Sequence, residues 1–386
     1  MSGRLAVPPV AAPDVSVVVV LYNAWEWSER ALRALVANTP PRYELIVVDN
    51  GSSDGTEAGL AAITGAAVIR NADNKGFGPA VNMAAQVARG RHLVLLNSDA
   101  LVEPGWLEPL LSVADADPGV AAVGSRLLNL DGTLQEAGAL VWRDGLVNNY
   151  GDGDRPDRPE YSFVRDVDYA SAACLLVRRS AFEELGGFDP VYAPAYLEDV
   201  DLCFALRARG MRIVYQPFST AVHVRWASGD RSATETLVRR NLPVFRDRWD
   251  AELARRPAFA GWPDRRFALE CRDALCLDRV LVVCEEVPPL GDAEGRRLDD
   301  SLVERLDLLR PVRFTIAVLG GAAPEPASET LRAAGIEVAW GPRDWDAWLS
   351  LRRNHYTRVV ACSARSADAL ATPLRQYQSS ALVERL

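Results

Sequence analysis

The sequence contains very little lysine. Among its 43 lysine and arginine residues only Lys75 is a lysine, and 52 aspartates and glutamates give a net charge of -9. A protein that binds nucleic acid needs a basic surface to neutralise phosphates. We therefore expect no nucleic-acid partner, and we interpret the preference for arginine first as a compositional bias.

Paired cysteines and long apolar runs are also missing. The six cysteines include no C-x-x-C pair, which argues against a zinc site or a disulfide framework and fits a reducing cytoplasm. Residues 1–13 lack the apolar stretch of a signal peptide. The longest apolar run, 15–21, falls far short of the ~20 residues of a membrane span. These absences predict a cytoplasmic protein without a transmembrane segment, which could also work at the inner membrane surface.

Two enzyme classes with related folds lack their motifs here. A dehydrogenase would place G-x-G-x-x-G after the first strand, and none is present. A sugar nucleotidyltransferase would need a glycine-rich loop with arginine and lysine there, whereas the sequence has Tyr22-Asn23-Ala24-Trp25. Neither class is therefore favoured as the function of this chain.

The first half of the chain alternates predicted strands and helices. Apolar runs typical of buried strands occur at 15–21, 44–48, 67–70 and 93–96, with helical patterns between them. This order predicts an α/β fold with a mostly parallel, doubly wound sheet, whose ligands bind beyond the carboxyl ends of the strands. Residues 124–171 look irregular, and we expect a flexible loop or lid beside the site. Later patterns predict strands at 213–216 and 220–224.

A second, smaller α/β unit is predicted near the C-terminus. Its expected strands are 279–284, 313–319, 336–340 and 358–361. At 386 residues the chain has room for two domains, which we place at 14–260 and 278–386. The second domain could be incomplete.

Three polar clusters carry the predicted chemistry. The first, Asp49–Thr56, follows a predicted strand, and a carboxylate there can accept a hydrogen bond from the ring N–H of a nucleobase. It could equally be a strand-to-helix turn with a capping aspartate. The second, Asn97-Ser98-Asp99, also follows a strand and can hold a divalent cation that bridges a diphosphate. The alternative is a helix cap for the segment that begins at Pro104.

The third cluster is Glu198-Asp199-Val200-Asp201. Repulsion between adjacent carboxylates should raise the pKa of at least one of them, as a general base requires. The alternative is a set of acidic residues in the first turn of a helix, which the helix dipole favours. We predict that Asp199 is catalytic, whereas Asp201 could be only such a helix residue.

In this order and spacing, the motifs resemble those of family 2 glycosyltransferases of the GT-A fold, in particular the rhamnosyltransferase-like branch. The resemblance spans about residues 14–255. It rests on five motifs and one asparagine: Asp49–Thr56, Asn74-Lys75-Gly76-Phe77-Gly78, Asn82, Asn97-Ser98-Asp99, Gly186-Gly187-Phe188-Asp189 and Glu198–Cys203.

The resemblance implies an inverting transfer of a hexosyl or deoxyhexosyl group that depends on Mn²⁺ or Mg²⁺. The donor would be a UDP, dTDP or GDP sugar, and the acceptor a glycan, lipid-linked or small-molecule hydroxyl, in glycan or polysaccharide assembly. Asp199 would be the base, and Asp99 and His223 the metal ligands. The implied donor-binding residues are Asp49, Asn50, Ser52, Lys75, Asn97 and Ser98; those that support the acceptor or the base are Glu198, Asp201, Tyr192 and Tyr196.

Several of these roles have plain structural alternatives. A single histidine such as His223 is often a structural residue, Lys75 could be solvated, and Tyr192 and Tyr196 could be packing aromatics. The segment from Arg279 onward resembles the first half of a GT-B N-terminal domain, with 287–291 as its loop after the first strand. The alternative for the whole chain is a non-catalytic module that binds a nucleotide sugar or glycan.

Overall fold

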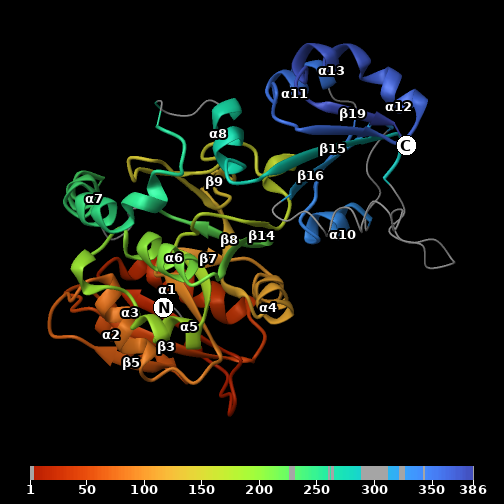
Figure 1. Ribbon diagram of the computed structural model, residues 1–386. Coiled ribbons are helices and arrows are strands. Elements are labelled where there is room, and N and C mark those ends of the chain that lie inside the picture. The colour runs from red at the N-terminus through yellow and green to blue at the C-terminus, as the bar shows by residue number, and fades with distance from the viewer. Residues whose placement is uncertain are drawn as a thin grey trace. The chain divides into compact units, whose positions relative to one another are not determined.

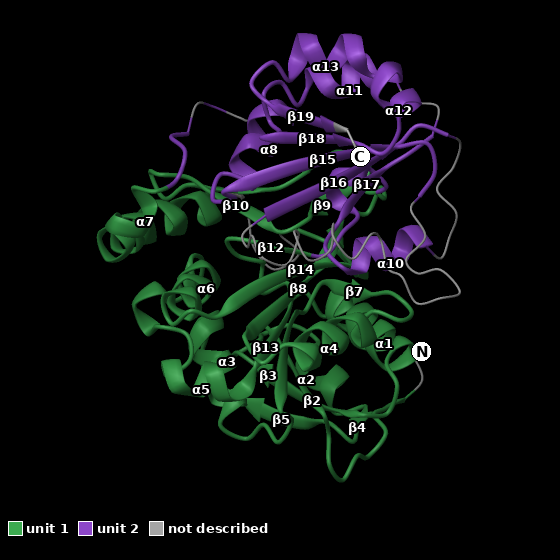
Figure 2. Cartoon of the chain, turned by 45° about the vertical axis from the view of Figure 1, so that its right-hand side comes forward, with its two compact units in different colours: residues 1–156, 165–255 green, residues 157–164, 256–386 purple. Residues whose placement is uncertain are grey.

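The computed structural model describes residues 4–225, 231–259, 261, 265–287, 312–320, 327–341 and 344–385 (Figure 1). The chain divides into two compact units, shown in Figure 2. Unit 1 contains residues 1–156 and 165–255, and unit 2 contains residues 157–164 and 256–386. The segment 157–164, which lies inside the predicted first domain, therefore belongs to unit 2.

Unit 1 is built on a ten-stranded sheet. Its first four long strands are parallel, in the order β6 (His92–Asn97), β2 (Val15–Leu21), β3 (Tyr43–Asp49) and β5 (Ala67–Arg70). Six of the seven residues of β2 are buried, as its continuous apolar run predicts. The predicted α/β fold class is confirmed, and Asp49 and Asn97 end two parallel strands, β3 and β6, that flank β2 at the same edge of the sheet.

The other half of this sheet is mixed. The strand β13 (Cys174–Arg178) lies antiparallel between β6 and β8 (Val120–Leu128). Next to β8 lies β14 (Arg212–His223), a single twelve-residue strand where two short strands were predicted. Its register shifts between Gln216 and Thr220, around Pro217, and this irregularity makes the apolar pattern look interrupted. Short strands β12 (Arg165–Asp166) and β7 (Ala100–Val102) pair with β14.

Helices cover both halves of the unit 1 sheet. The helix α3 contacts β2 and β3, whereas α4 and α6 contact β14. The helices of unit 1 are α1 (Trp25–Asn38), α2 (Thr56–Leu60), α3 (Phe77–Ala85), α4 (Leu107–Ala116), α5 (Arg179–Leu185), α6 (Glu198–Ala208) and α7 (Arg231–Leu253). Outside the large sheet, β1 (Leu5–Ala6) pairs with β4 (Ile63–Thr64).

The prediction of a flexible loop at 124–171 was wrong. This stretch contains the end of β8, then β9 (Leu134–Glu136), β10 (Ala139–Val141), β11 (Val147–Asn149) and β12, and it buries Trp142 completely. Strands of two or three residues are too short to show alternating polarity, so the sequence pattern could not reveal them. The strand β9 pairs with β8 and is buried along its whole length.

Unit 2 is a small α/β unit, as predicted. Its five parallel strands lie in the order β17-β16-β15-β18-β19, which in chain order is 3-2-1-4-5, a doubly wound arrangement. The strands are β15 (Asp278–Cys284), β16 (Val312–Val318), β17 (Glu337–Ala339), β18 (Arg358–Ala361) and β19 (Leu382–Arg385). The helices are α8 (Arg265–Arg272), α10 (Ala327–Ala333), α11 (Trp345–Ser350), α12 (Ala364–Ala369) and α13 (Ala371–Tyr377). Most of the predicted loop 287–291 lies outside the described residues.

The segment 157–164 is held in unit 2 by buried charges. Glu160, in the short 3-10 helix Pro159–Tyr161, is 2% exposed and pairs with Arg265. The Val164 N–H donates to the carbonyl oxygen of Arg332 at 2.9 Å. Arg352 binds Glu337 at 2.8 Å, and both are almost fully buried. Unit 2 therefore includes residues 157–164, although the next residue in the chain begins β12 of unit 1.

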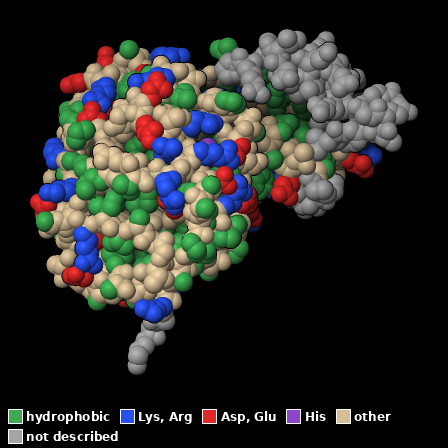
Figure 3. All heavy atoms as spheres, turned by 90° about the horizontal axis from the view of Figure 1, so that it is seen from below, with side chains coloured by type: hydrophobic (Ala, Val, Ile, Leu, Met, Phe, Trp, Pro, Cys, Tyr) green, Lys and Arg blue, Asp and Glu red, His purple; other side chains and the backbone are tan. Residues whose placement is uncertain are grey.

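The surface shown in Figure 3 carries acidic and basic side chains side by side. Charged side chains of the described residues often form ion pairs, such as Arg212 with Asp117 at 2.7 Å. Within the described ranges, no helix has both the length and the apolar character needed to cross a membrane.

Candidate active site

The end of β3 forms the first part of the site. The carboxylate of Asp49 is 5% exposed, and its Oδ1 accepts a hydrogen bond from the Ser52 N–H at 3.0 Å. Its Oδ2 lies 3.7 Å from Nε of Arg70, the last residue of the neighbouring strand β5. The Ser52 hydroxyl in turn accepts the Asn23 N–H at 2.9 Å. The turn thus holds a carboxylate at the carboxyl edge of the sheet.

Asn50 fastens the loop at 71–76 to this turn. Its amide nitrogen donates to Asn74 Oδ1 at 2.8 Å and to the Gly76 carbonyl at 3.1 Å, while its Oδ1 accepts from Asn71 Nδ2 and from the Lys75 N–H. These bonds use both ends of the amide, so Asn50 shapes the loop. The Lys75 ammonium pairs with Asp73, and its side chain is half exposed.

Gly76 is required by the backbone at the start of α3. Its φ is +93°, and a Cβ at this position would lie 2.6 Å from the carbonyl oxygen of Pro194. The Phe77 N–H also donates to this oxygen, at 2.7 Å. A glycine therefore lets the loop at 71–76 approach the segment that precedes α6.

Asp99 and His223 meet at the ends of β6 and β14. Asp99 Oδ1 lies 3.2 Å from His223 Nε2, and Asn97 Nδ2 lies 3.1 Å from the same ring nitrogen. Ser98, between Asn97 and Asp99, is buried. The structure thus brings together the two residues predicted as metal ligands, although 124 positions of sequence separate 99 from 223.

Gln135, on β9, orients His223. The His223 Nδ1 lies 2.6 Å from Gln135 Oε1, while Gln135 Nε2 donates to the His223 carbonyl and to Asn129 Oδ1 at 2.9 and 3.0 Å. Because the amide nitrogen is used as a donor, Oε1 accepts the Nδ1 proton, and Nε2 lies beside Asp99 and Asn97.

This donor set fits a divalent cation. One carboxylate oxygen and one imidazole nitrogen are suitable for Mn²⁺, and Mg²⁺ is often held by one or two protein ligands plus phosphate and water oxygens. No cluster of three or more histidine, cysteine, aspartate or glutamate side chains suited to a metal occurs among the described residues. A cation here would therefore depend on a diphosphate for further ligands.

Asp199 lies in the first turn of α6. Its Oδ2 accepts the Ala172 N–H at 3.1 Å, and its Oδ1 accepts the Val200 N–H at 2.9 Å. Glu198 is buried, whereas Asp199 keeps partial exposure. Burial raises the pKa of both carboxyls, and the charge of Asp199 raises that of Glu198 further. Desolvation is thus the main cause, rather than the repulsion expected from the sequence.

Glu136 is a carboxyl of the site that sequence reasoning missed, together with Gln135. Its Oε1 accepts the Ser171 N–H at 3.0 Å. Burial raises the pKa of Glu136 to about 8, and the charge of Asp199 adds to the effect. A single Gln-Glu pair in an apparently irregular stretch matches no motif, so only the fold reveals these two residues.

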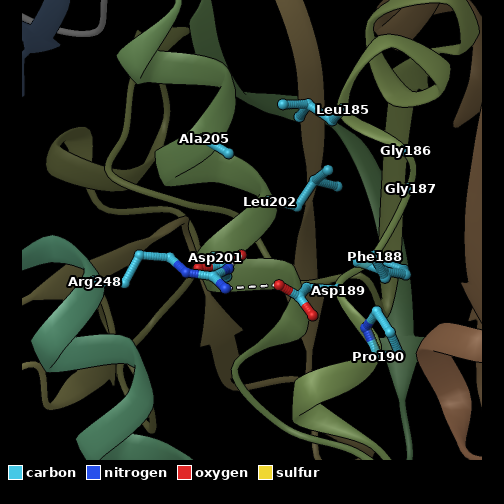
Figure 4. A pocket seen from close by; sticks show the side chains of 10 residues that line it. All are labelled: Leu185, Gly186, Gly187, Phe188, Asp189, Pro190, Asp201, Leu202, Ala205 and Arg248. Carbon is cyan, nitrogen blue, oxygen red and sulfur yellow. Dashed lines mark hydrogen bonds and ion pairs between the residues drawn. The ribbon is translucent and has the colours of Figure 1, made fainter.

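Asp201 and the two tyrosines form hydrogen bonds with other side chains of unit 1. Asp201 accepts hydrogen bonds from Trp249 Nε1, Arg248 Nη1 and the Tyr192 hydroxyl at 2.8, 2.8 and 3.0 Å. Arg248 also binds Asp189, and these charges line a cleft of about 340 Å³ beside α6 (Figure 4). The Tyr196 hydroxyl bonds Thr234 at 2.6 Å. The hydrogen bonds of Asp201 therefore join α6 to α7. Asp199, two residues earlier, instead accepts a hydrogen bond from the turn before β13.

Comparison with known proteins gives one family. Residues 16–186 match Glycosyl transferase family 2. The chain is 31% identical to the N-acetylglucosaminyl-diphospho-decaprenol L-rhamnosyltransferase of Mycobacterium tuberculosis, over 59% of the chain and 82% of that protein. It is 32% identical to the O-antigen biosynthesis protein RfbC of Myxococcus xanthus, over 58% of the chain and 18% of the relative.

Other relatives and structures are matched less completely. The chain spans 30% or less of two of the curated relatives that it matches. Among solved structures, GalNAc-T7 with UDP, GalNAc and Mn²⁺ is 19% identical, with a TM-score of 0.47, over 55% of the chain and 44% of that structure.

Proposed function

Because the chain belongs to glycosyl transferase family 2, we propose that it transfers a hexosyl or deoxyhexosyl group from a nucleoside-diphosphate donor to an acceptor hydroxyl, with inversion at the anomeric carbon. Its relatives include an O-antigen biosynthesis protein and a rhamnosyltransferase, and this supports a role in glycan assembly. The acceptor would be a glycan, a lipid-linked sugar or a small molecule.

One observation carries the proposal. Asp99 and His223 are suited to a cation, and Asp199 is a carboxylate with a raised pKa. Hydrogen bonds connect both groups to adjacent residues of the short strand β9. Gln135 bonds His223, and Glu136 bonds the turn that bonds Asp199. Transfer from a nucleotide sugar needs a diphosphate site and a base within one site, and β9 joins the two.

The donor would lie along the carboxyl edge of the sheet. Asp49 would accept the ring N–H of the base, and Asp99 and His223 would hold Mn²⁺ or Mg²⁺ at the diphosphate. When bound, such a cation offsets the charge of the departing nucleoside diphosphate. Asn50 and Gly76 shape the loop beside this edge, and Lys75 could exchange its partner Asp73 for a phosphate.

Asp199 would act as the general base. Its carboxylate accepts the proton of the acceptor hydroxyl while that oxygen forms a bond to the anomeric carbon. The bond from this carbon to the phosphate oxygen breaks on the opposite face, and the nucleoside diphosphate leaves with the electron pair. Burial supports this role, since a carboxylate with a raised pKa is a stronger base at neutral pH.

Thermal stabilisation by nucleotides tests the donor site. UDP, dTDP and GDP would each be added with and without Mn²⁺, and the melting temperature compared. We expect one nucleotide to stabilise the protein only with Mn²⁺, by ~2.7 kcal/mol at a hundredfold excess over Kd. The variant His223→Ala should lose the dependence on Mn²⁺. Stabilisation that is equal with and without Mn²⁺ would contradict the metal site.

Product analysis tests the reaction. A donor with the preferred base would be incubated with the protein, and release of nucleoside diphosphate and the anomeric configuration of the product would be measured. Transfer with inversion is expected. Nucleotide binding without transfer or donor hydrolysis would instead favour a non-catalytic sugar-nucleotide module.

A further inference from the structure

Glu136, at the end of β9, is a buried carboxyl with one unused oxygen. The residue is 1% exposed, and its Oε1 accepts the Ser171 N–H at 3.0 Å. Its Oε2 is buried and has no hydrogen-bond partner among the residues that the structure describes. A buried polar atom without a partner is uncommon and points to a functional constraint at this position.

The Ser171–Ala172 turn connects Glu136 to Asp199. Two successive N–H groups of the turn each bind a carboxyl: Ser171 binds Glu136, and Ala172 binds Asp199 Oδ2 at 3.1 Å. The Ser171 hydroxyl accepts the Ala173 N–H at 3.2 Å, and the Asn97 N–H donates to the Ala173 carbonyl at 3.0 Å. Because these bonds share one short turn, movement at Ser171 would move the donor that orients Asp199.

Burial is the main reason why the neutral form of Glu136 is favoured. The negative charges of Asp199, on α6, and of Asp152 add to this effect, whereas Arg225, which binds Asp152 at 2.7 Å, opposes it. The Arg165 guanidinium donates to the carbonyl of the next residue, Ala137. Tyr169 is also near, and its pKa is raised by burial and by the charges of Glu136 and Asp199. With its own pKa raised to about 8, Glu136 can hold the Ser171 N–H at neutral pH without adding a second negative charge beside Asp199.

We propose that Glu136 is a positioning residue for sugar transfer, which acts through the Ser171–Ala172 turn on Asp199. The inference rests on the proposed function, because it takes Asp199 as the base. The role requires an oxygen that accepts the Ser171 N–H, and it does not require a charge. A glutamine at position 136 can supply such an oxygen, whereas an alanine cannot.

The test compares Glu136→Gln and Glu136→Ala, each alone and combined with Asp199→Asn. In Glu136→Ala, kcat should fall about tenfold to a hundredfold, with an unchanged KM for the donor, and Glu136→Gln should restore most of the loss. In the Asp199→Asn background, Glu136→Ala should lower kcat no further, since residues that act as a unit are not additive.

Two measurements separate this role from general damage. The stabilisation by nucleotide and Mn²⁺ should survive in Glu136→Ala, because Gln135 and His223 are unchanged. Hydrogen exchange of the Ser171 and Ala172 amides should be faster in Glu136→Ala than in Glu136→Gln. This second measurement does not depend on turnover.

Each outcome is decisive. The inference fails if Glu136→Ala keeps the wild-type kcat, if its effect adds fully to that of Asp199→Asn, or if Glu136→Gln is as slow as Glu136→Ala. If the wild type transfers no sugar, the proposed function fails separately. The amide exchange then decides whether Glu136 holds the turn: equal rates in the two variants overturn the positioning role.

Discussion

The Oε1 atom of Gln135 lies 2.6 Å from Nδ1 of His223. Two further hydrogen bonds of the Gln135 amide nitrogen prevent the amide from turning round. The ring is therefore held with Nδ1 toward Gln135 and Nε2 toward Asp99 and Asn97. Substitution of a side chain that hydrogen-bonds a metal ligand commonly lowers the metal affinity of a site by 10–100-fold.

Removal of the Gln135 amide should weaken the metal site. In Gln135→Ala, His223 loses the acceptor for its Nδ1 proton, so we expect about tenfold or more weaker binding of Mn²⁺ in the presence of nucleotide. Titration of Mn²⁺ followed by melting temperature would measure it. Asn129→Ala is a milder control, because it removes one partner of Gln135 and leaves the bond to His223. An unchanged Mn²⁺ affinity in Gln135→Ala would count against His223 as a ligand.

Asp199 and Asp201 form a matched pair, two residues apart on α6. Asp199→Asn should lower kcat by about 10²–10⁴-fold and leave nucleotide binding intact, because the amide cannot take the proton. Asp201→Asn should instead lower the melting temperature, since Asp201 is held by Arg248, Trp249 and Tyr192, with little change in kcat for the folded protein. The reverse pattern would exchange the two roles.

The raised pKa of Glu136 should make stability depend on pH. Its pKa rises from 4.5 in the unfolded chain to about 8 in the folded state, so the folded state binds more protons between these values. Stability therefore falls as pH rises through this window, by up to about 1.4 kcal/mol per pH unit. In Glu136→Gln this loss disappears, and the stability of the variant relative to the wild type should increase from about pH 5 to pH 8 and then level off.

Denaturant-induced unfolding at several pH values would measure the difference in stability between Glu136→Gln and the wild type. The matched control is Glu103→Gln, which changes an exposed glutamate of unit 1. Its stability relative to the wild type should stay nearly constant over the same range. A constant difference for Glu136→Gln as well would mean that Glu136 is ionised in the folded protein at neutral pH.

Alanine substitutions at Gly76 and Gly186 would distinguish the cost of a positive φ from the cost of steric crowding. Both have a left-handed φ, +93° and +82°, but a Cβ at Gly76 would meet Pro194, whereas Gly186 has open space around it. Gly186→Ala should cost about 1–2 kcal/mol of stability. Gly76→Ala should cost more and should also reduce nucleotide binding, because the loop at 71–76 must move. Equal melting temperatures and nucleotide affinities in the two variants would argue against the close approach to Pro194.

Buried charge in unit 2 gives a further prediction. Arg352→Met would leave Glu337 with fewer partners in a fully buried position, and breaking such a pair costs about 3–5 kcal/mol. The control Arg358→Met breaks a more exposed pair with Glu384 and should cost about 0–1 kcal/mol. Hydrogen exchange along β15 and β18 would measure both. Similar protection in the two variants would contradict a structural role for the buried pair.

Much of the fold could be predicted from the sequence alone. Continuous apolar runs identify β2, β3 and β6, because strands buried on both faces need apolar side chains at every position. The same logic finds β15 and β16 in unit 2. It also places Asp49 and Asp99 near the carboxyl edge of the sheet, since each follows one of these runs.

The tertiary structure decided what local patterns do not encode. Short strands such as β9 carry no periodicity, so Gln135 and Glu136 became visible only when β9 paired with β8. The pairing of β14 with β7 sets His223 beside Asp99. Desolvation, which raises the pKa of Asp199, depends on atoms from distant parts of the chain. The sequence thus determined which residue types end the strands, and the packing of remote segments decided which of them meet and how acidic they are.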